Sequence, residues 1–327
     1  MKKVLVTGAT GFLGKYVVEE LSQYGYQVKA FGRNKTIGQA LENSFVSFYQ
    51  GDLTKEKEIE EACKGMDYVV HAGALSTVWG DWKDFYKTNV LGTKYVLEAC
   101  KKEKIKRLVY VSSPSIYAAA KDQLNIKEDE APKENYLNNY IRSKLTSEQL
   151  FKDYPDVPSI ILRPRGLFGI GDTSILPRVL KLSQKIGIPL IKDGRQLMDM
   201  TCVENVALAI RLSLETSRAN NGKVYNITNG EPREFKSLIE ETLKGLGYPI
   251  KYRKIPSSLL FITASALEMI YKSLKLKGEP ALTRYTYYLL RYSQTLDIHK
   301  AEKELGYRPK ISISEGIEKY VKNYREH

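Results

Sequence analysis

The sequence begins with a short apolar strand that runs directly into a glycine turn, VTGATGFLG at residues 6–14. Gly8, Gly11 and Gly14 lie three residues apart, and the segment FLGKYVVEELSQYG has apolar residues at helical spacing. Glycine permits a tight turn and lets the backbone approach a pyrophosphate, whose charge then lies at the N-terminus of the helix. A strand, a glycine turn and a helix in this order predict a dinucleotide-binding site, and the alternative is a glycine turn without a ligand.

Short β-branched segments alternate with helical patterns through the first half of the chain. The predicted strands are KKVLVTG, YQVKAFGRN, SFVSFYQGDL, MDYVVHAGA, KRLVYVSSPS and PSIILRPRG. Strands that are apolar along their length and alternate with helices indicate a parallel sheet covered on both faces. We therefore predict an α/β protein with a doubly wound parallel sheet in residues 1–165. Residues 166–327 should form a smaller, largely helical substrate lobe, with residues 198–228 returning to the first domain.

The composition is that of an ordinary globular protein, with 43% hydrophobic and 27% charged residues in a chain of 327. The apolar stretch SSLLFITASALEMIY is interrupted by Glu268 and is too short and too mixed to span a bilayer. The N-terminal apolar run is too short for the core of a signal peptide. Cys63, Cys100 and Cys202 are scattered and lack the spacing of metal ligands. We expect a cytoplasmic protein without a metal site.

The net charge of +13 raises the question of nucleic-acid binding. The lysines are spread along the whole chain and interleaved with glutamates, as in TKEKEIEEACKG. A nucleic-acid footprint requires a clustered basic patch, so we expect no nucleic-acid partner.

The segment NNYIRSKLTSE, at the tail of a predicted helix, places Tyr140 and Lys144 four residues apart. Residues at this spacing lie one above the other on one helix face, so the lysine ammonium can lie near the tyrosine oxygen. With 23 Tyr and 51 Lys plus Arg in the chain, a chance pair is the simpler explanation unless other motifs supply a context.

The glycine turn together with Tyr140 and Lys144 resembles the extended short-chain dehydrogenases/reductases, the NAD-dependent epimerase/dehydratase superfamily. The resemblance covers nearly the whole chain, and its further landmarks occur in order: Asp52-Leu53, HAGA at 71–74, Asn89, VSSPSIY and RPRGLFG. It implies a Rossmann-type fold and an NAD(P)-dependent oxidoreductase. A dinucleotide-binding protein without turnover is an alternative, but such relatives commonly lose the tyrosine or the lysine.

In this family a tyrosine, a lysine and a serine surround the nicotinamide. A phenol with a pKa of about 10 is a poor base at neutral pH, and a nearby ammonium together with the oxidised nicotinamide would lower that pKa. Tyr140 would then exchange a proton with the substrate oxygen, and Lys144 would also hold the nicotinamide ribose. The family usually places the catalytic Ser or Thr four residues before the tyrosine of VSSPSIY, which selects Ser113 and leaves Ser112 as the next candidate.

The resemblance also implies a set of cofactor contacts. They are Gly8, Thr10, Gly11, Phe12, Leu13, Gly14, Arg33, Asp52, Leu53, Ala72, Gly73, Ala74, Asn89, Tyr140, Lys144 and Pro164. Asp52 would accept a hydrogen bond from the adenine amino group, with Leu53 beside the ring. Asn89 would either contact the cofactor or stabilise the backbone of the site. His71 is expected to end a buried strand and not to act in catalysis.

The residues after the second predicted strand indicate whether the cofactor carries a 2′-phosphate, as NADP does. NAD-preferring members carry an acidic residue there that binds the ribose hydroxyls, whereas this chain has Gly32 followed by Arg33. A guanidinium in place of a carboxylate suits a 2′-phosphate, so NADP is favoured over NAD. The alternative is an arginine that stacks on the adenine, which an NAD enzyme could also use.

The superfamily includes nucleotide-sugar enzymes as well as reductases of apolar substrates, and fold alone does not choose between them. In the sugar enzymes an arginine that meets the diphosphate precedes an aspartate. Here Met198 occupies that position before Asp199, although Arg195 or Arg178 could take its place. DMTCVENVALA, SSPSIY and LDIHKAEKELGYRPKISISEGI resemble the 3β-hydroxysteroid dehydrogenase-like branch, which includes 2-alkyl-3-oxoalkanoate reductases.

The expected substrate is therefore a secondary alcohol or ketone on an apolar skeleton, with nucleotide-sugar epimerisation or dehydration as the alternative. The candidate substrate contacts are Ser113, Ser115, Arg165, Arg178 and Met198. The segment PSSLLFITASALEMIYKSLKLKG could pack on the lobe, line an apolar pocket or contact a membrane surface, and packing is favoured. A homodimer is one open alternative for the assembly.

Overall fold

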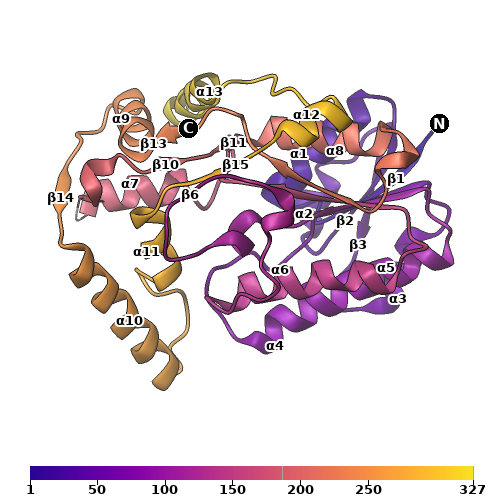
Figure 1. The fold of residues 1–327 in the computed structure, drawn as a ribbon. Coiled ribbons are helices and arrows are strands. Elements are labelled where there is room, and N and C mark those ends of the chain that lie inside the picture. The colour runs from indigo at the N-terminus through magenta and orange to yellow at the C-terminus, as the bar shows by residue number, and fades with distance from the viewer. Residues whose placement is uncertain (186, 327) are drawn as a thin grey trace.

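The computed structural model describes residues 1–185 and 187–326, and its centre is a seven-stranded parallel sheet (Figure 1). The strand order is β12-β7-β5-β4-β1-β2-β3, so the chain winds outward in both directions from β1. The strands are β1 (Lys3–Thr7), β2 (Gln27–Gly32), β3 (Val46–Gln50), β4 (Tyr68–His71), β5 (Arg107–Val111), β7 (Ser159–Pro164) and β12 (Lys223–Ile227). This order confirms the predicted doubly wound sheet.

Alternating side chains of each strand supply two separate apolar layers. In β1, Val4 and Val6 join the core beneath α1 (Phe12–Gln23) and α8 (Val203–Glu215). Leu5 faces the opposite side and joins the core beneath α3 (Glu56–Cys63) and α5 (Gly92–Lys102). Figure 1 shows these two helical layers on either side of the sheet. Both faces are covered, which explains why these strands are apolar along their whole length.

A single long helical segment precedes β5, and its middle is a π-helix. It consists of α4 (Trp82–Phe85), the π-helical η1 (Tyr86–Leu91) and α5. The helical pattern of DFYKTNVLGTKYVLEACKKE, residues 84–103, predicts a helix here but not its π-helical start. Segments of π-helix are frequent at functional sites, and this one contains Asn89.

The C-terminal part forms a mixed lobe. Its helices are α7 (Leu176–Lys185), α9 (Phe235–Gly245), α10 (Ser257–Ser273), α11 (Arg284–Arg291) and α13 (Ile313–Glu326). Helix α12 (His299–Leu305) instead packs on the large sheet, where Ala301 and Leu305 join the core that contains Val4. The lobe also contains a four-stranded sheet in the order β13 (Arg233–Glu234), β10 (Leu197–Met198), β15 (Gln294–Leu296) and β6 (Gln123–Ile126). Two smaller sheets pair β8 (Leu167–Phe168) with β11 (Thr201–Cys202) and β9 (Ile188–Leu190) with β14 (Tyr252–Lys254).

Two strands, as well as α12, cross between the predicted halves. β12 pairs with β7 in the large sheet, as the expected return of residues 198–228 requires. In the other direction, β6 leaves the first half and pairs with β15, an arrangement that the sequence did not reveal. The boundary at residue 165 stays a prediction.

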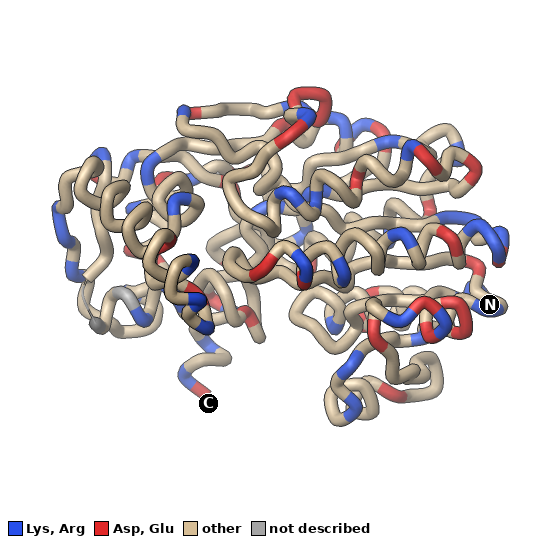
Figure 2. The backbone as a smooth tube through the Cα atoms, turned by 90° about the horizontal axis from the view of Figure 1, so that it is seen from below, with Lys and Arg blue, Asp and Glu red and all other residues tan. Residues whose placement is uncertain are grey.

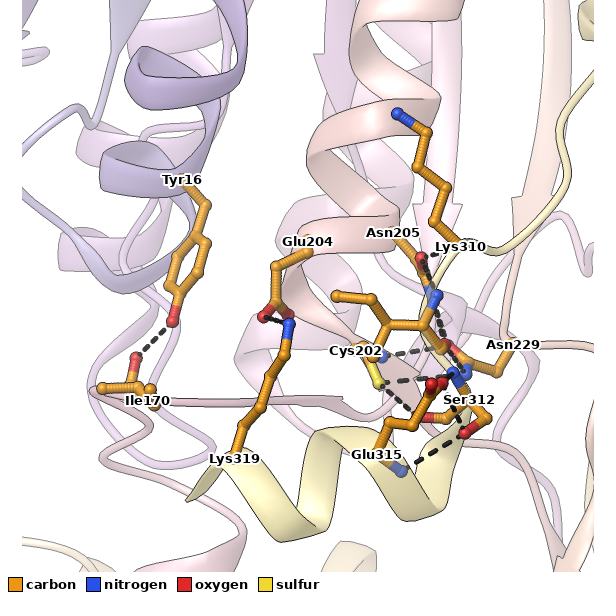
Figure 3. A network of polar contacts seen from close by, with 11 residues as sticks. Tyr16, Ile170, Cys202, Glu204, Asn205, Asn229, Lys310, Ser312, Glu315 and Lys319 are labelled. Atoms are coloured by element: carbon orange, nitrogen blue, oxygen red, sulfur yellow. Dashed lines mark hydrogen bonds and ion pairs between the residues drawn. The ribbon is translucent and has the colours of Figure 1, made fainter. Parts of the chain in front are cut away.

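Buried amides attach the C-terminal segment to the first turn of α8 (Figure 3). Asn205 is fully buried and accepts hydrogen bonds from the backbone N–H of Lys310 at 2.8 Å and of Ile311 at 3.2 Å. Its amide donates to the Ile311 carbonyl at 2.7 Å and to Asn229 Oδ1 at 2.9 Å. Asn229 donates to the same carbonyl and accepts from the Cys202 N–H. These bonds fix the segment that leads into α13, and Ile313 and Ile317 of that helix add apolar packing in the core of the lobe.

We expect Asn205→Ala to lower the free energy of unfolding by about 2–4 kcal/mol. The substitution leaves buried backbone groups of the C-terminal segment without partners, and each such group costs about 1–3 kcal/mol. Urea denaturation followed by circular dichroism measures the change. Gln39→Ala, at an exposed amide on α2 (Lys35–Gln39), is the control and should leave stability within error. Equal midpoints for the two variants would contradict the prediction.

Charged residues are dispersed over the molecule. Figure 2 shows Lys and Arg interspersed with Asp and Glu along the helices. Over the described part of the chain, no helix has both the length and the apolar character needed to cross a membrane.

Candidate active site

The glycine turn after β1 is packed so closely that side chains would not fit. Gly8 has φ +72°, and a Cβ there would lie 2.6 Å from the Cα of Gly73. A Cβ on Gly14 would lie 2.1 Å from the Gly8 carbonyl oxygen. The Gly11 N–H donates to that same carbonyl at 2.9 Å, which closes the turn. Helix α1 can therefore start directly against the end of β1.

The N-terminus of α1 carries no cap from a side chain. Gly11 is the N-cap residue and is exposed, so the first N–H groups of the helix remain available to an anion. Leu13 packs into the core beneath the helix, and Phe12 lies edge-on to Tyr16 at 5.9 Å between ring centroids. The uncapped helix and the glycine turn together fit the pyrophosphate of a dinucleotide.

The end of β2 presents the residues that bear on the adenosine half of the cofactor. Arg33 is exposed, and its charge lies close enough to Asp52 to lower the pKa of that carboxyl. Burial opposes this shift, and hydrogen bonds from Thr54 also contribute to it. A Cβ on Gly32 would lie 2.7 Å from Thr10 Oγ1, so close packing against Thr10 also favours a glycine at this position.

The end of β4 lies across the turn from Gly8. A Cβ on Gly73 would be 2.7 Å from Leu53 Cδ1, which places Leu53 against the HAGA segment. Ala72 and Ala74 flank Gly73 and are partly buried. Thr7 Oγ1 accepts a hydrogen bond from the Gly73 N–H at 3.3 Å. The predicted residues of this edge therefore surround the glycine turn.

His71 lies at the buried end of β4. Its Nδ1 is 2.7 Å from Thr7 Oγ1, and its Nε2 is 3.0 Å from Thr93 Oγ1. Burial lowers the pKa of His71 to about 3, with a further contribution from the charge of Lys144, so the ring is neutral. Both ring nitrogens are occupied, which agrees with the expectation of a structural residue.

Asn89 in η1 connects two parts of the site. Its Oδ1 accepts from the Leu75 N–H at 2.7 Å, and its Nδ2 donates to the Leu75 carbonyl at 3.0 Å. The same amide donates to Ser143 Oγ of α6 (Asn139–Leu150) at 2.9 Å. The side chain is 2% exposed and its hydrogen-bonding groups are already used by the protein. The geometry therefore supports the backbone-stabilising role and not a direct contact with the cofactor.

Tyr140 lies in the first turn of α6, not at the tail of a helix as the sequence suggested. Asn138 caps this helix by accepting a hydrogen bond from the Ile141 N–H at 2.8 Å. Burial raises the pKa of Tyr140 to about 12, a hydrogen bond with Ser113 lowers it, and nearby Tyr285 raises it. The phenol is therefore protonated at neutral pH, and its oxygen adjoins the serine hydroxyl.

Lys144 lies one turn further along α6 and is 3% exposed. Its ammonium donates to the Val111 carbonyl at 2.9 Å and to the Tyr110 hydroxyl at 3.3 Å. Burial lowers the pKa of Lys144 to about 8, while Glu148 raises it. The hydrogen bonds of Lys144 go to β5, and the lowering of the Tyr140 pKa by this ammonium together with an oxidised nicotinamide stays a prediction.

The two serine candidates point to different partners. Ser113 Oγ adjoins the Tyr140 oxygen and lies 2.8 Å from Ser115 Oγ. Ser112 is buried and donates to the carboxylate of Glu148, which also pairs with Arg163 at 2.6 Å. The geometry thus favours Ser113 over Ser112 for contact with substrate.

Ser115 connects the Ser113 hydroxyl to the C-terminal lobe. It hydrogen-bonds Tyr285, whose pKa is raised by burial and lowered by the charges of Arg165 and Arg178 and by Ser115. Arg165 is 7% exposed; its Nη1 donates to Gln294 Oε1, and its buried Nε has no hydrogen-bond partner among the described residues. Ser115, Tyr285 and Arg165 therefore lie together next to Ser113.

Tyr285 is a residue that the sequence reasoning missed. It is the second residue of α11, whose start is fixed by a Thr283 cap and by Glu268. Glu268 accepts from the Arg284 N–H at 2.7 Å and from its Nε at 2.8 Å. The segment RYTYYLLRY has several tyrosines without a motif spacing, so no local signal distinguishes Tyr285 from its neighbours.

Arg178 and Met198, two other predicted substrate contacts, lie in different surroundings. Arg178 on α7 pairs with Glu279 at 2.9 Å, and Glu279 also accepts from Thr77 at 3.5 Å. Met198 packs against the apolar core of the lobe. Asp199 beside it is buried and accepts from the Leu296 N–H at 2.6 Å; burial raises its pKa to about 6.

Pro164, the last predicted cofactor contact, ends β7 and is buried opposite Ile227. Cys63, Cys100 and Cys202 are buried free thiols. Within residues 1–185 and 187–326, no cluster of three or more His, Cys, Asp or Glu side chains could hold a metal ion.

Comparison with known proteins gives matches over the whole chain. The NAD dependent epimerase/dehydratase family matches residues 4–228. The 2-alkyl-3-oxoalkanoate reductase of Stenotrophomonas maltophilia (strain K279a) is 33% identical, covering 96% of this chain and 97% of that protein. The "Sterol-4-alpha-carboxylate 3-dehydrogenase, decarboxylating" of Mus musculus is 31% identical, covering 99% of this chain and 91% of that protein.

A solved structure shares the fold. The UDP-glucuronic acid 4-epimerase from Bacillus cereus in complex with NAD aligns with a TM-score of 0.78 and 24% identity. The alignment covers 98% of this chain and 99% of that chain. At this identity the likeness concerns the fold alone.

The matches confirm the predicted family and the predicted branch within it. They also agree with a site that combines a glycine turn, an uncapped helix N-terminus and a buried tyrosine beside a serine. The protein is an oxidoreductase-type enzyme of a family that uses NAD. The chain belongs to the NAD dependent epimerase/dehydratase family, the extended type of short-chain dehydrogenase/reductase.

Proposed function

We propose that the protein interconverts a ketone and a secondary alcohol on a largely apolar substrate, with a 3-oxo or 3-hydroxy acid as the preferred class and a sterol-like ring as a variant. The observation that carries the proposal is Arg165, a buried arginine whose Nε is unpaired next to Tyr285. A buried guanidinium donor without a partner fits a carboxylate, with which it forms charge-assisted hydrogen bonds. The reductase relative named above, which acts on an oxoalkanoate, agrees with this class.

The chain's own groups suit the reduction of a carbonyl. Tyr140 is protonated at neutral pH, so it can donate its proton to the substrate oxygen as that oxygen gains charge. Ser113 would donate a second hydrogen bond to the same oxygen. Lys144, held by Val111 and Tyr110, would orient the nicotinamide ribose. A bound nicotinamide would supply the hydride that completes the reduction.

The walls around Tyr285 are apolar. Tyr285 packs against a cluster that joins η2 (Pro114–Tyr117), α6 and β15. The buried members of this cluster are Ile116, Tyr117, Ile126, Ile141, Leu145 and Leu296. An apolar site with a few polar anchors binds a substrate chiefly by burying its CH₂ groups.

Conversion of a nucleotide sugar is the second candidate. The shared fold of the UDP-glucuronic acid epimerase keeps it open, since one fold can carry both kinds of reaction. Two features oppose it. Met198 stands where the sugar enzymes carry an arginine, and Arg178, a candidate replacement, is paired with Glu279.

A chain-length series tests the substrate class. With NADPH and a set of 3-oxo acids, kcat/KM should rise by roughly fourfold for each added CH₂ until the pocket is full, since burying one CH₂ contributes about 0.8 kcal/mol. Matched ketones without the carboxylate should react less efficiently, and Arg165→Met should remove that difference. Efficient conversion of UDP- or dTDP-sugars with no response to chain length would overturn the proposal.

We also propose that NADP is the preferred form of the cofactor. NADPH should bind more tightly than NADH, and Arg33→Ala should remove most of the difference, because one charged contact to a phosphate contributes roughly 1.5–3 kcal/mol. Titration of protein fluorescence with each cofactor measures both affinities.

NADH serves as the internal control for this substitution. If Arg33 contacts the 2′-phosphate, the NADH affinity should not change in Arg33→Ala. If Arg33 stacks on the adenine, both affinities should fall together. Arg33→Lys keeps the charge but not the planar fork, and should retain part of the preference. Equal affinities of the wild-type protein for both cofactors would rule the assignment out.

A further inference from the structure

Helix α10 has apolar residues around its whole circumference, yet only one side of it is covered. Leu260 and Ala264 are buried against Tyr287 of α11 and Ile191. The remaining surface faces outward, and Figure 1 shows the helix projecting at the edge of the lobe. A helix that is apolar all round is normally buried all round. Its outer side therefore lacks a cover in the isolated chain.

The uncovered side presents a continuous apolar stripe. Its members follow one another at intervals of three, seven, one and four residues, which places them on one broad face of a helix with 3.6 residues per turn. They are Leu259 (53% exposed), Ile262 (63%), Met269 (67%), Ile270 (42%) and Leu274 (66%). Single exposed apolar residues are ordinary, but a contiguous stripe rimmed by polar groups indicates an interaction surface.

Basic residues stand at both ends of this stripe. They are Lys251, Arg253 and Lys254 before the helix and Lys272, Lys275 and Lys277 at its end, and all of them are exposed. Between residues 249 and 278 the single acidic residue is Glu268. Glu268 is buried and neutralised by Arg284, so it does not offset the positive rim. Asp193 lies 3.9 Å from Lys254 and is the acidic neighbour of the rim, so the charge on this side is mainly positive.

A groove along the flank of α10 combines both kinds of group. It has a volume of about 540 Å³. Phe261 and Met269 line it on the apolar side, and Lys272 lines it on the polar side together with the paired Arg284 and Glu268. Apolar and cationic groups next to each other suit an amphiphile that has acyl chains and an anionic head.

We propose that α10 docks the protein on an anionic lipid surface, with the apolar stripe at the level of the acyl chains and the basic rim at the headgroups. Each basic residue near such a surface contributes attraction, and the stripe adds burial of apolar area. A second copy of the chain is the less suitable occupant, because a two-fold contact through this face would bring the two positive rims together. The proposal does not depend on which substrate the enzyme uses.

The docking surface adjoins the loop that follows β4. Tyr271 of α10 lies edge-on to Trp79 at 6.1 Å between ring centroids, and the Lys272 ammonium lies 5.8 Å from the Trp79 ring. Thr77 in the same loop contacts Glu279, which follows the helix. The proposed lipid-facing helix and the loop after β4 of the large sheet are therefore connected by direct contacts.

Vesicle co-sedimentation tests the proposal. Wild-type protein should sediment with vesicles of phosphatidylcholine and phosphatidylglycerol, and much less with phosphatidylcholine alone. The double variant Ile262→Glu/Met269→Glu should reduce binding by at least about tenfold, because two apolar groups that the lipid would bury are replaced by charges. Lys275→Glu/Lys277→Glu should reduce binding to the anionic vesicles only.

Matched controls separate a local effect from a general one. Leu124 is 56% exposed on β6 in another part of the molecule, so Leu124→Glu should bind vesicles as the wild type does. Lys57→Glu/Lys121→Glu makes the same charge change at exposed lysines elsewhere and should retain most of the binding. Circular dichroism and NADPH binding confirm that each variant is folded.

Three outcomes would overturn the proposal. The first is no binding to anionic vesicles by the wild-type protein. The second is equal binding by the wild type and by the Ile262→Glu/Met269→Glu variant. The third is a wild-type dimer in sedimentation velocity that this double variant converts to monomer without any vesicle binding, which would assign the stripe to contact between copies.

Discussion

Replacing Tyr140 by phenylalanine should lower kcat by about 10²–10⁴ and leave dinucleotide affinity nearly unchanged. The substitution removes only the oxygen that is proposed to transfer the proton. The ring remains, and its packing 6.3 Å from the Phe85 ring is retained. Because the phenol is buried, loss of its hydroxyl also removes the partner of Ser113.

The measurement combines turnover with cofactor titration. NADPH oxidation with the best substrate of the chain-length series gives kcat, and fluorescence titration gives the cofactor affinity. Tyr136→Phe is the matched control, since Tyr136 is 63% exposed and lies just before the same helix. It should turn over as the wild type does. A Tyr140→Phe enzyme with wild-type turnover would show that Tyr140 is not the proton donor.

Replacing Ser113 by alanine should lower kcat by about 10²–10³, the effect of removing one hydrogen-bond donor from a developing oxyanion. Ser112→Ala should leave kcat unchanged, because Ser112 donates to Glu148 and not toward Tyr140. Since Glu148 pairs with the buried Arg163, loss of the Ser112 hydroxyl should appear in the free energy of unfolding, by about 1 kcal/mol.

The two serine variants therefore separate catalysis from stability. Turnover at saturating substrate shows whether each serine contributes to catalysis. Urea denaturation shows whether it contributes to the stability of the fold. Ser113→Thr keeps a hydroxyl and should recover part of the turnover. A larger loss of kcat in Ser112→Ala than in Ser113→Ala would reverse the assignment.

Local sequence patterns were sufficient to predict the half of the fold that carries the glycine turn. The glycine turn and the apolar strands are local signals, because a strand buried on both faces must be apolar throughout and a turn against Gly73 excludes side chains. Six of the seven strands of the large sheet were predicted from such runs, and the order of the motifs identified the family. The helix period likewise predicts that Tyr140 and Lys144, four residues apart, lie on one face of their helix.

The tertiary structure alone decided what surrounds these residues. Lys144 forms its hydrogen bonds with β5, Asn89 is occupied by Leu75 and Ser143, and Tyr140 has a raised pKa because it is buried. The partners lie tens of residues away in the chain, so no spacing rule connects them.

The substrate side of the site is where local sequence patterns predict least about which side chains meet. Tyr285 lies in a tyrosine-rich helix with no motif, and it reaches Ser115 and Arg165 only because the lobe folds back over the sheet edge. Strand β6 leaves the first half of the chain to pair with β15 for the same reason. Local periodicity determines which elements form, whereas burial and long-range pairing determine which side chains meet.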